Sequence, residues 1–348
     1  CGHDGHMDAV LLVSFGGPES MSEVMPFLRR VTAGRNVPGE RLELVAQHYY
    51  ARDGVSPINA QNRRLTDALI ERFAQDGLNV YWGNRNSPPW LTDAFQQMVD
   101  AGVTRAITVF TSAYSSYSGC RQYRENLAEA MDTVPPFDVV KIPAYFNSAG
   151  FVAANLENLL AVLDSAGADS HLVFTTHSIP EVMAHTSGPG GGQYVAQHRA
   201  LARELVDRVA AATGRTYPWE LVYQSRSGPP QVPWLEPDIN DHLEQLAGSG
   251  ATSAVVVPIG FVSDHMEVVQ DLDTEAAQTA DSLGLAFHRV ATVGDHPVFV
   301  DGLVDWVRAV RRGEIPQTVF DEALPTPCLP GCCPNPRVQR PALCEGSA

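Results

Sequence analysis

The sequence predicts an α/β protein of two similar doubly wound domains, each with a four-stranded parallel sheet, facing each other across a cleft. Short apolar runs alternate with amphipathic helical stretches, a pattern typical of parallel sheets covered on both faces. The expected strands form two sets of four, with a break near residues 145–150. A length of 348 residues also suits two domains better than one.

Each expected strand is a short apolar run bounded by turn residues. In chain order the strands are Ala9–Phe15, Asn79–Gly83, Ala106–Ser112, Val139–Tyr145, His171–Thr176, Leu221–Ser225, Ala254–Phe261 and Ala286–Val290. Helical periodicity lies between them; for example, Leu65, Leu69 and Phe73 share one face and Gly77 marks the end of that helix. The predicted helices are Arg64–Gln75, Ala149–Leu163, Gln193–Thr213, Glu267–Leu283 and Pro297–Arg312.

These elements divide the chain into four parts. We expect a flexible leader over residues 1–7, a first domain over 8–147, a second over 148–318 and a cysteine-rich tail over 319–348. The leader lacks the apolar region of a signal peptide, so a cytoplasmic location is expected. The tail is rich in proline and irregular, which indicates that something covalent or coordinative holds it to the body.

Charge and hydropathy exclude two classes of partner. The formal net charge of −16 repels nucleic acid and anionic lipid but raises the local concentration of metal cations. The longest apolar stretches, such as Ala254–Ile259, are far shorter than the ~20 residues that span a bilayer. We therefore expect no nucleic-acid partner and no stable insertion into a membrane.

The motif FTTHSIP, residues 174–180, is the first candidate site. An apolar strand runs directly into His177, so this side chain lies at the carboxyl end of a strand, where α/β proteins place reactive groups. Imidazole exchanges a proton near neutral pH and also binds transition metals. A hydrogen-bonded histidine at a strand edge is the structural alternative.

A second candidate is the acidic row of FVSDHMEVVQDLDTE, residues 261–275. Glu267, Asp271 and Glu275 are spaced four residues apart and share one helix face beside His265. Aligned carboxylates can pass a cation inward or carry protons outward. A solvated helix face is the structural alternative.

The cysteines form the third signal. Cys120 stands alone in the middle of the chain, whereas Cys328, Cys332, Cys333 and Cys344 crowd the tail. In a chain without a secretory signal, clustered thiols indicate metal ligation rather than disulfides.

Five motifs in order resemble those of the ferrochelatases: LLVSFGGPES (11–20), DGVSPI (53–58), FTTHSIP, PWLEP (233–237) and FVSDHMEVVQDLDTE. The resemblance covers nearly the whole chain up to about Arg312. It implies that a porphyrin binds between the two domains and that ferrous iron, the second substrate, is inserted into it. In such a reaction the enzyme distorts the flat ring and removes two N–H protons.

The resemblance also implies roles for single residues. His177 matches the active-site histidine, as base or metal-binding group, and Glu267 matches the carboxylate facing it. Asp271, Glu275 and His265 fall on the iron path. In some bacterial relatives a tyrosine that can ligate the product iron occupies the position of Phe15, and phenylalanine cannot do so. The positions expected to line the porphyrin site are Phe15, Ser56, Arg85, Tyr123, Tyr194, Trp234 and Phe261.

Some ferrochelatases carry a [2Fe–2S] cluster on one internal cysteine and three near the carboxyl terminus. By this resemblance the ligands are Cys120, Cys328, Cys332 and Cys333, with Cys344 as a substitute. Four thiolates also suit a structural zinc site, and unligated thiols are the remaining alternative. The expected effect of the cluster is to tie the tail to the body.

Arg29, Arg30 and Arg35 concentrate positive charge in a polar segment, which suits the carboxylates of coproporphyrin III better than those of protoporphyrin IX. This combination resembles the actinobacterial coproporphyrin ferrochelatases. A monomer with transient contacts to neighbouring haem-pathway enzymes is expected. The alternatives are a protoporphyrin IX ferrochelatase, a chelatase for another metal, a non-catalytic porphyrin carrier and a cluster-based sensor.

Overall fold

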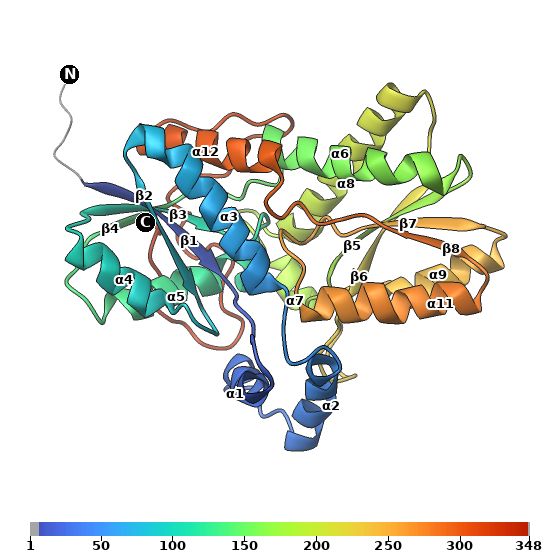
Figure 1. The fold of residues 1–348 in the computed structure, drawn as a ribbon, viewed down its shortest axis with the longest axis horizontal. Helices are drawn as coiled ribbons and strands as arrows, with labels where there is room; N and C mark the ends of the chain where they lie inside the picture. The colour runs from blue at the N-terminus through green and yellow to red at the C-terminus, as the bar shows by residue number, and fades with distance from the viewer. Residues whose placement is uncertain (1–6, 347–348) are drawn as a thin grey trace.

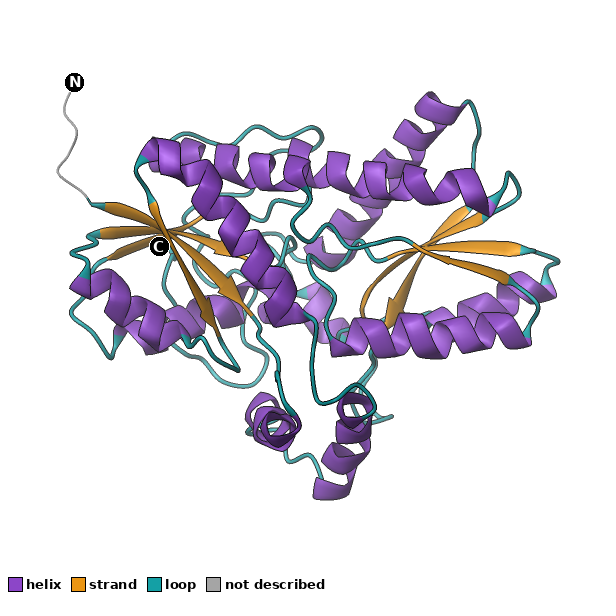
Figure 2. Ribbon diagram, viewed as in Figure 1, coloured by secondary structure: helices purple, strands orange, loops and turns teal. Residues whose placement is uncertain are grey.

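The computed structural model describes residues 7–346 and contains two four-stranded parallel sheets (Figures 1 and 2). The first sheet has the order β2-β1-β3-β4 and the second the order β6-β5-β7-β8. Their strands are β1 (Asp8–Ser14), β2 (Asn79–Asn84), β3 (Arg105–Phe110), β4 (Asp138–Lys141), β5 (His171–His177), β6 (Trp219–Gln224), β7 (Ser253–Val257) and β8 (Ala286–Arg289). The predicted fold class is confirmed, since both sheets follow the same topology.

The central strands β1 and β5 occupy equivalent places in the two sheets. Val10 of β1 pairs with Val80 and Ile107 on its two sides, and Phe174 of β5 pairs with Leu221 and Val257. Both strands are buried on both faces, which explains their continuous apolar runs. The order of the strands reverses beside each central strand: the next strand in sequence lies on one side, and the following two lie on the other. Phe15 and His177 therefore leave the two sheets at equivalent switch points.

Helices cover both faces of each sheet (Figure 1). α4 (Leu91–Asp100) and α5 (Gln122–Met131) cover one face of the first sheet, and α3 (Ile58–Phe73) covers the other with α12 (Pro297–Arg311). α6 (Ala149–Ala166) and α8 (Gln193–Thr213) cover one face of the second sheet. α9 (Ile239–Gly248) and α11 (Ala277–Ser282) cover its other face, and α7 (Glu181–His185) precedes α8.

Helix α12 ties the two halves together. It follows the second sheet in sequence but packs on the first, where Arg308 pairs with Asp76 at 2.7 Å and Arg311 with Asp8 at 2.9 Å. The largest group of buried apolar side chains is also shared, since it includes Leu12 of β1 and Phe174 of β5. The domain boundaries at residues 148 and 318 stay a prediction.

All eight predicted strands form, and their ends shift by only a few residues. The sequence pattern missed the short helices α4, α5, α7 and α9, and also α1 (Met21–Val31) and α2 (Gly39–Tyr50), which lie away from both sheets in Figure 1. Pro26 and the Gly/Pro-rich residues between α1 and α2 favoured an irregular segment, although Val24, Phe27 and Leu28 share one buried face of α1. The two helices bury Phe27 and Tyr49 against each other and Met266.

The acidic row is not on one regular α-helix. The expected helix Glu267–Leu283 consists of α10 (Met266–Val268), the wider π-helical turn η3 (Val269–Ala276) and α11. A second π-helical turn, η2 (Tyr117–Arg121), carries Cys120, and the short 3₁₀ turn η1 (Ala74–Asp76) ends α3. Wider turns of this kind occur often at functional sites.

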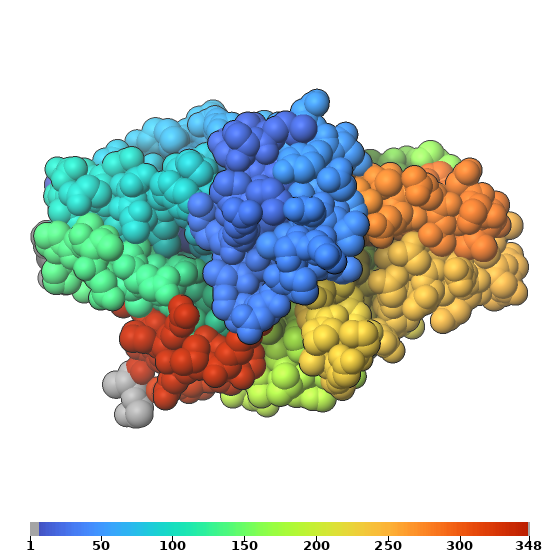
Figure 3. Space-filling view, turned by 90° about the horizontal axis from the view of Figure 1, so that it is seen from below, coloured from blue at the N-terminus to red at the C-terminus, as the bar shows by residue number. Residues whose placement is uncertain are grey.

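The tail crosses the surface as irregular chain. From residue 312 to residue 346 the described chain contains no helix or regular strand, as its proline content predicted. Figure 3 shows this tail (red) on the same face as the N-terminal segment that carries α1 and α2 (dark blue). Within residues 7–346, no helix is long and apolar enough to cross a bilayer. All of the expected leader except Met7 lies outside the described residues.

Candidate active site

His177 is the last residue of β5 and is partly buried, with 29% of its side chain exposed. Its Nδ1 is hydrogen-bonded to the backbone carbonyl of Ser178, and since a carbonyl only accepts, Nδ1 carries a proton. Nε2 lies 3.4 Å from Oε2 of Glu267. The strand end and the neighbouring carbonyl therefore fix both the direction and the tautomer of this imidazole.

Glu267 stands at the beginning of α10, where the chain leaves β7 and turns back toward β5. The nearby His265 caps this helix: its Nδ1 accepts the backbone N–H of Val268 at 3.1 Å. Because that nitrogen accepts, the neutral ring carries its proton on Nε2, which lies 3.9 Å from Glu267. One carboxylate thus lies between two imidazoles.

The charges of these groups depend on one another. Burial alone would lower the pKa of His177, but the hydrogen bond and charge of Glu267, the Ser178 carbonyl and the charge of Asp271 together outweigh burial and raise the pKa above its usual value. Burial would raise the pKa of Glu267, but His177 holds it below its usual range. Desolvation lowers the pKa of His265, so the second imidazole favours the neutral form. The site therefore favours an ion pair between His177 and Glu267.

Asp271 lies one π-helical turn beyond Glu267 and accepts a hydrogen bond from the Ser225 hydroxyl. Burial raises the pKa of Asp271 to about 7, and the charges of Glu267 and Glu275 add to this effect. Asp271 can therefore gain or lose a proton near neutral pH. Glu275 lies farther along, exposed, and accepts a hydrogen bond from Gln270 at 3.2 Å.

Three predicted aromatic residues lie around this group, each with a different role. Phe261 packs edge-on against His265 with ring centroids 5.4 Å apart. Tyr194 is buried, and its hydroxyl donates to the backbone oxygen of His177 at 2.8 Å. Trp234 forms a bridge with Pro180 just after the FTTHSIP strand, and its buried indole N–H has no partner among the described residues.

A second predicted group lies at the carboxyl end of β1. The Arg85 guanidinium lies 4.4 Å from the centre of the Tyr123 ring and 5.6 Å from the centre of the Phe15 ring. Arg85 also donates to Asn126 at 2.6 Å. Ser56 is buried and its backbone N–H bonds to Pro18. Arg85 thus brings a cation to the side of the site that the first sheet provides.

The three predicted arginines of the α1 region are not one cluster. Arg30 donates to the carbonyl of Asn86 at 2.6 Å and lies over the Trp90 ring, which occupies it within the first domain. Arg29 is exposed on the same helix. Arg35 follows α1, is exposed, and interacts electrostatically with Glu267 and Arg85. Of the three arginines, Arg35 is therefore the one whose charge acts on the candidate site.

Four predicted cysteines gather in one buried cluster: Cys120, Cys328, Cys332 and Cys333. The sulfurs of Cys332 and Cys333 are 3.7 Å apart. The Cys344 sulfur lies 3.3 Å from the carbonyl of Val139, and its side chain packs against the core of the first sheet instead. Within residues 7–346, no group of three or more His, Cys, Asp or Glu side chains has the geometry of a metal-ion site.

Buried cations surround the cysteine cluster. Lys141 is 4% exposed and shares the wall of a small pocket with Cys120, Cys328 and Cys332. Burial opposes its charge, but the nearby thiols outweigh burial and raise the pKa of Lys141 to about 12. Arg124 has no exposed surface and lies 3.4 Å from Glu345 of the tail. These cations make the cysteine cluster a favourable place for negative charge.

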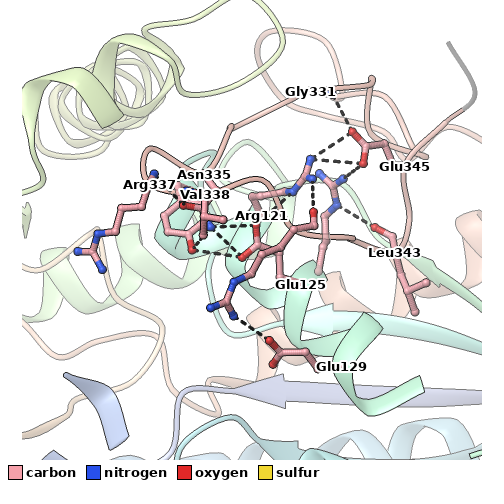
Figure 4. Close-up of polar contacts among 12 residues, drawn as sticks. Arg121, Glu125, Glu129, Gly331, Asn335, Arg337, Val338, Leu343 and Glu345 are labelled. Atoms are coloured by element: carbon pink, nitrogen blue, oxygen red, sulfur yellow. Dashed lines mark hydrogen bonds and ion pairs between the residues drawn. The ribbon is translucent and has the colours of Figure 1, made fainter. Parts of the chain in front are cut away.

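Polar contacts fasten the tail to η2 and α5 (Figure 4). Glu345 accepts hydrogen bonds from Arg121 at 3.2 Å and from the backbone of Gly331 at 2.7 Å. Asn335 donates to the hydroxyl of Tyr117 at 2.8 Å. The tail therefore packs on the same turn that supplies Cys120.

The sequence reasoning missed Ser225 and Lys141. Ser225 follows β6 with a positive φ of 62°, and this turn aims its hydroxyl at Asp271. Ser225 ends a predicted strand, and this position could have indicated a site residue. Lys141 ends β4, and nothing in its local sequence indicates that the lysine is buried beside thiols.

Comparisons with known proteins identify the family and the fold. The family model for ferrochelatases matches residues 7–310. A coproporphyrin III ferrochelatase of Frankia alni is 51% identical over 96% of this chain and 88% of that protein. One of Streptomyces griseus is 51% identical over 96% of this chain and 95% of that protein. Among solved structures, CbiX, a terminal enzyme of sirohaem biosynthesis, shares the fold with a TM-score of 0.50 at 14% identity, covering 86% of this chain and 98% of CbiX.

Proposed function

The chain belongs to the ferrochelatase family, and we propose that it inserts ferrous iron into coproporphyrin III to give coprohaem III in haem biosynthesis. The observation that carries this function is the 3.4 Å apposition of His177 and Glu267 at the carboxyl end of β5, with Asp271 behind them. Insertion exchanges one Fe²⁺ for the two protons of the pyrrole N–H groups, so the site must handle both a cation and protons.

His177 is the proposed base. The neutral ring is the form that acts as a base: its Nδ1 proton is engaged by Ser178, and Nε2 is the atom that accepts a proton from the porphyrin. The Glu267 carboxylate stabilises the resulting imidazolium, as the raised pKa of His177 indicates. Asp271, with a pKa of about 7, can then accept a proton and release it to solvent at neutral pH. Glu267 and Glu275 supply the oxygen ligands of an entry path for Fe²⁺.

The proposed substrate follows from the named relatives and from the cations of the site. Coproporphyrin III carries four carboxylates, and Arg35 and Arg85 bring positive charge to an otherwise acidic molecule. Arg30 contributes less, because Asn86 and Trp90 already occupy it. The rings of Phe15, Tyr123, Trp234 and Phe261 are proposed to contact the macrocycle or support its pocket, and Ser56 flanks them.

We also infer that Cys120, Cys328, Cys332 and Cys333 hold a [2Fe–2S] cluster. Two thiolates bound tetrahedrally to one metal at ~2.3 Å lie about 3.8 Å apart, which agrees with the 3.7 Å between Cys332 and Cys333. Lys141 and Arg124 offset the negative charge of four thiolates. The kind and number of the sulfur donors and the neighbouring cations therefore support this inference, and the proposed effect of the cluster is to hold the tail against η2.

The cysteines also bear on location. Free thiols persist in reducing compartments, whereas oxidising compartments convert such clusters to disulfides. We therefore infer a cytoplasmic enzyme. As a separate proposal, it acts as a monomer on coproporphyrin III and Fe²⁺.

The direct test is anaerobic mixing of the purified chain with Fe²⁺ and either coproporphyrin III or protoporphyrin IX, followed by visible absorption. We expect the free-base bands of coproporphyrin III to give way to the metalloporphyrin spectrum, with faster turnover than for protoporphyrin IX. A porphyrin that binds but stays metal-free with every divalent ion would support the carrier alternative instead.

The His177→Ala variant tests the assigned base. We expect kcat to fall by about 10²–10⁴, the usual contribution of a positioned acid or base, while coproporphyrin III still binds. His171→Ala is the matched control, because His171 begins the same strand whose end carries His177. Equal losses in both variants would mean that the strand, and not the imidazole at its end, had been damaged.

A further inference from the structure

The segment Ser187–Tyr194 lies between the cysteine cluster and His177. At one end, the backbone N–H of Gly188 donates to the sulfur of Cys333 at 3.1 Å, in a buried position. At the other end, the hydroxyl of Tyr194 donates to the backbone oxygen of His177 at 2.8 Å. One short stretch of chain therefore contacts both groups through hydrogen bonds.

Internal contacts leave this segment little freedom. Ser187 is fully buried, and its hydroxyl accepts the backbone N–H of Tyr194 at 2.7 Å. Its carbonyl accepts the N–H of Gln193 at 3.1 Å, which closes the segment into a compact loop. Gly188 has a φ of +75°, and a Cβ there would collide with the side chain of Gln193. Movement of Gly188 is thus passed on to the beginning of α8.

The hydroxyl of Tyr194 bonds to the protein itself, at the end of β5. Its hydroxyl lies 2.8 Å from both the Thr176 hydroxyl and the His177 carbonyl, and its ring is buried. These bonds hold the end of β5, where the imidazole of His177 leaves the sheet. Tyr194 is therefore suited to position His177 through its backbone, without contacting the imidazole.

We propose that Tyr194 is a positioning residue for His177 and that the Ser187–Tyr194 segment couples its position to Cys333. The proposal rests on the ferrochelatase function proposed above. When Cys333 is held in place, Gly188 and Tyr194 hold the end of β5 so that His177 faces Glu267. When Cys333 loses its place, the segment relaxes and His177 leaves its position facing Glu267.

Hydrogen exchange tests the coupling without any turnover. Amide exchange in peptides covering residues 176–178 and 187–194 is measured by mass spectrometry in the wild type, Cys333→Ala and Cys344→Ala. We expect faster exchange of both peptides only in Cys333→Ala, with α3 unchanged in every protein as the internal reference for folding. Unchanged exchange at residues 187–194 in Cys333→Ala would overturn the proposal.

Kinetics test the positioning role. In Tyr194→Phe we expect kcat to fall about tenfold, the equivalent of one lost buried hydrogen bond, with an unchanged KM for coproporphyrin III. Tyr145→Phe is the matched control: its hydroxyl is equally buried and donates to the Phe110 carbonyl at 2.7 Å, remote from β5. A raised KM with an unchanged kcat would make Tyr194 a substrate contact and refute the positioning role.

The double variant Cys333→Ala/Tyr194→Phe shows whether the two residues act together. If both act through one segment, the double variant loses no more activity than Cys333→Ala alone. Losses that multiply would show two independent effects and contradict the coupling. Complete inactivity of the wild type would refute the proposed chelatase function, and hydrogen exchange would still decide the coupling.

Discussion

At the scale of single residues, the site is an arrangement of groups whose protonation states differ because of their surroundings. His177 and Glu267 stabilise each other as an ion pair, while burial keeps Asp271 protonated up to about neutral pH. Groups whose pKa values are pushed apart in this way are typical of sites that move protons. Above neutral pH the buried carboxyl of Asp271 must ionise, and this lowers the free energy of unfolding.

The Asp271→Asn variant should be more stable than the wild type at neutral pH. Folding raises the pKa of Asp271 from 3.8 to about 7, so the folded protein binds a proton more tightly than the unfolded chain. Stability therefore falls as the pH rises through this window, and an amide, which cannot ionise, avoids the loss. After allowance for its partial exposure, we expect a gain on the order of 1 kcal/mol near pH 8.

Thermal unfolding from pH 5 to pH 8 measures this gain. The difference in melting temperature between Asp271→Asn and the wild type should grow with pH, while iron insertion slows. Asp207→Asn, on the exposed face of α8, controls for removing one negative charge from an acidic protein. A difference independent of pH, or one matched by the control, would show that the carboxyl of Asp271 is not the cause.

Single site residues could be predicted from the sequence only where they lie in a motif or at the end of a strand. His177, Glu267 and Asp271 come together because β5 and β7 are neighbours and both lead into the site. Ser225 and Lys141 act through tertiary contacts that no local pattern encodes. Arg30 fits the pattern of an anion-binding arginine, yet Trp90 and Asn86 take up its guanidinium.

At the scale of elements, the strands could be predicted because burial on both faces leaves a continuous apolar run. α1, α2, α4, α5 and α9 were not predicted, because each has only 10–12 residues and so shows little of the helical period. The π-helical turn η3 was also missed, since one extra residue per turn barely changes an i, i+4 pattern. The crossing of α6 and α12 is another contact between elements that sequence does not reveal.

Gly150→Ala should destabilise this crossing. A Cβ at Gly150 of α6 would lie 2.5 Å from the Val298 carbonyl and 2.8 Å from the Cα of Gly302 in α12. Both are backbone atoms, so the helices must separate, at a cost of about 1–3 kcal/mol. Because α12 joins the two halves, chemical denaturation should report this loss for the whole fold.

Gly248→Ala is the matched control for that substitution. Gly248 is also in a helix, at the end of α9, and a Cβ added there would meet no atom within 4 Å beyond its own stretch of helix. Alanine there should be neutral or stabilising by up to about 1 kcal/mol. Equal destabilisation by both substitutions would attribute the effect to helix propensity in general and not to the crossing.

At the scale of the whole molecule, three connections join the parts of the chain. α12 carries the second half back onto the first sheet, the shared core fills the space between the sheets, and the tail returns to η2. The first two follow from packing of apolar surface. The tail is held by three kinds of contact: Phe320, Leu324 and Leu343 pack against the cores, Glu345 and Asn335 make polar contacts with η2, and three of the four buried cysteines come from the tail.

Cys328→Ser should therefore release the tail. A group bound by Cys120 and Cys328 links positions more than 200 residues apart, and such a link stabilises mainly by restricting the unfolded chain. We expect loss of bound iron and sulfide and a fall of about 2–5 kcal/mol in the free energy of unfolding, by analogy with a disulfide closing a long loop. Limited proteolysis should then cut within residues 313–346, which the wild type protects.

Cys344→Ser separates this effect from the general loss of a thiol. Cys344 packs against the first sheet beside Val139, outside the cluster of four, so its variant should keep both iron and a protected tail. If Cys344→Ser lost iron while Cys328→Ser kept it, the ligand set would have to exchange these two cysteines. If both variants kept the tail protected, its apolar and polar contacts would suffice to hold it, and the cysteine cluster would have no structural part in the fold.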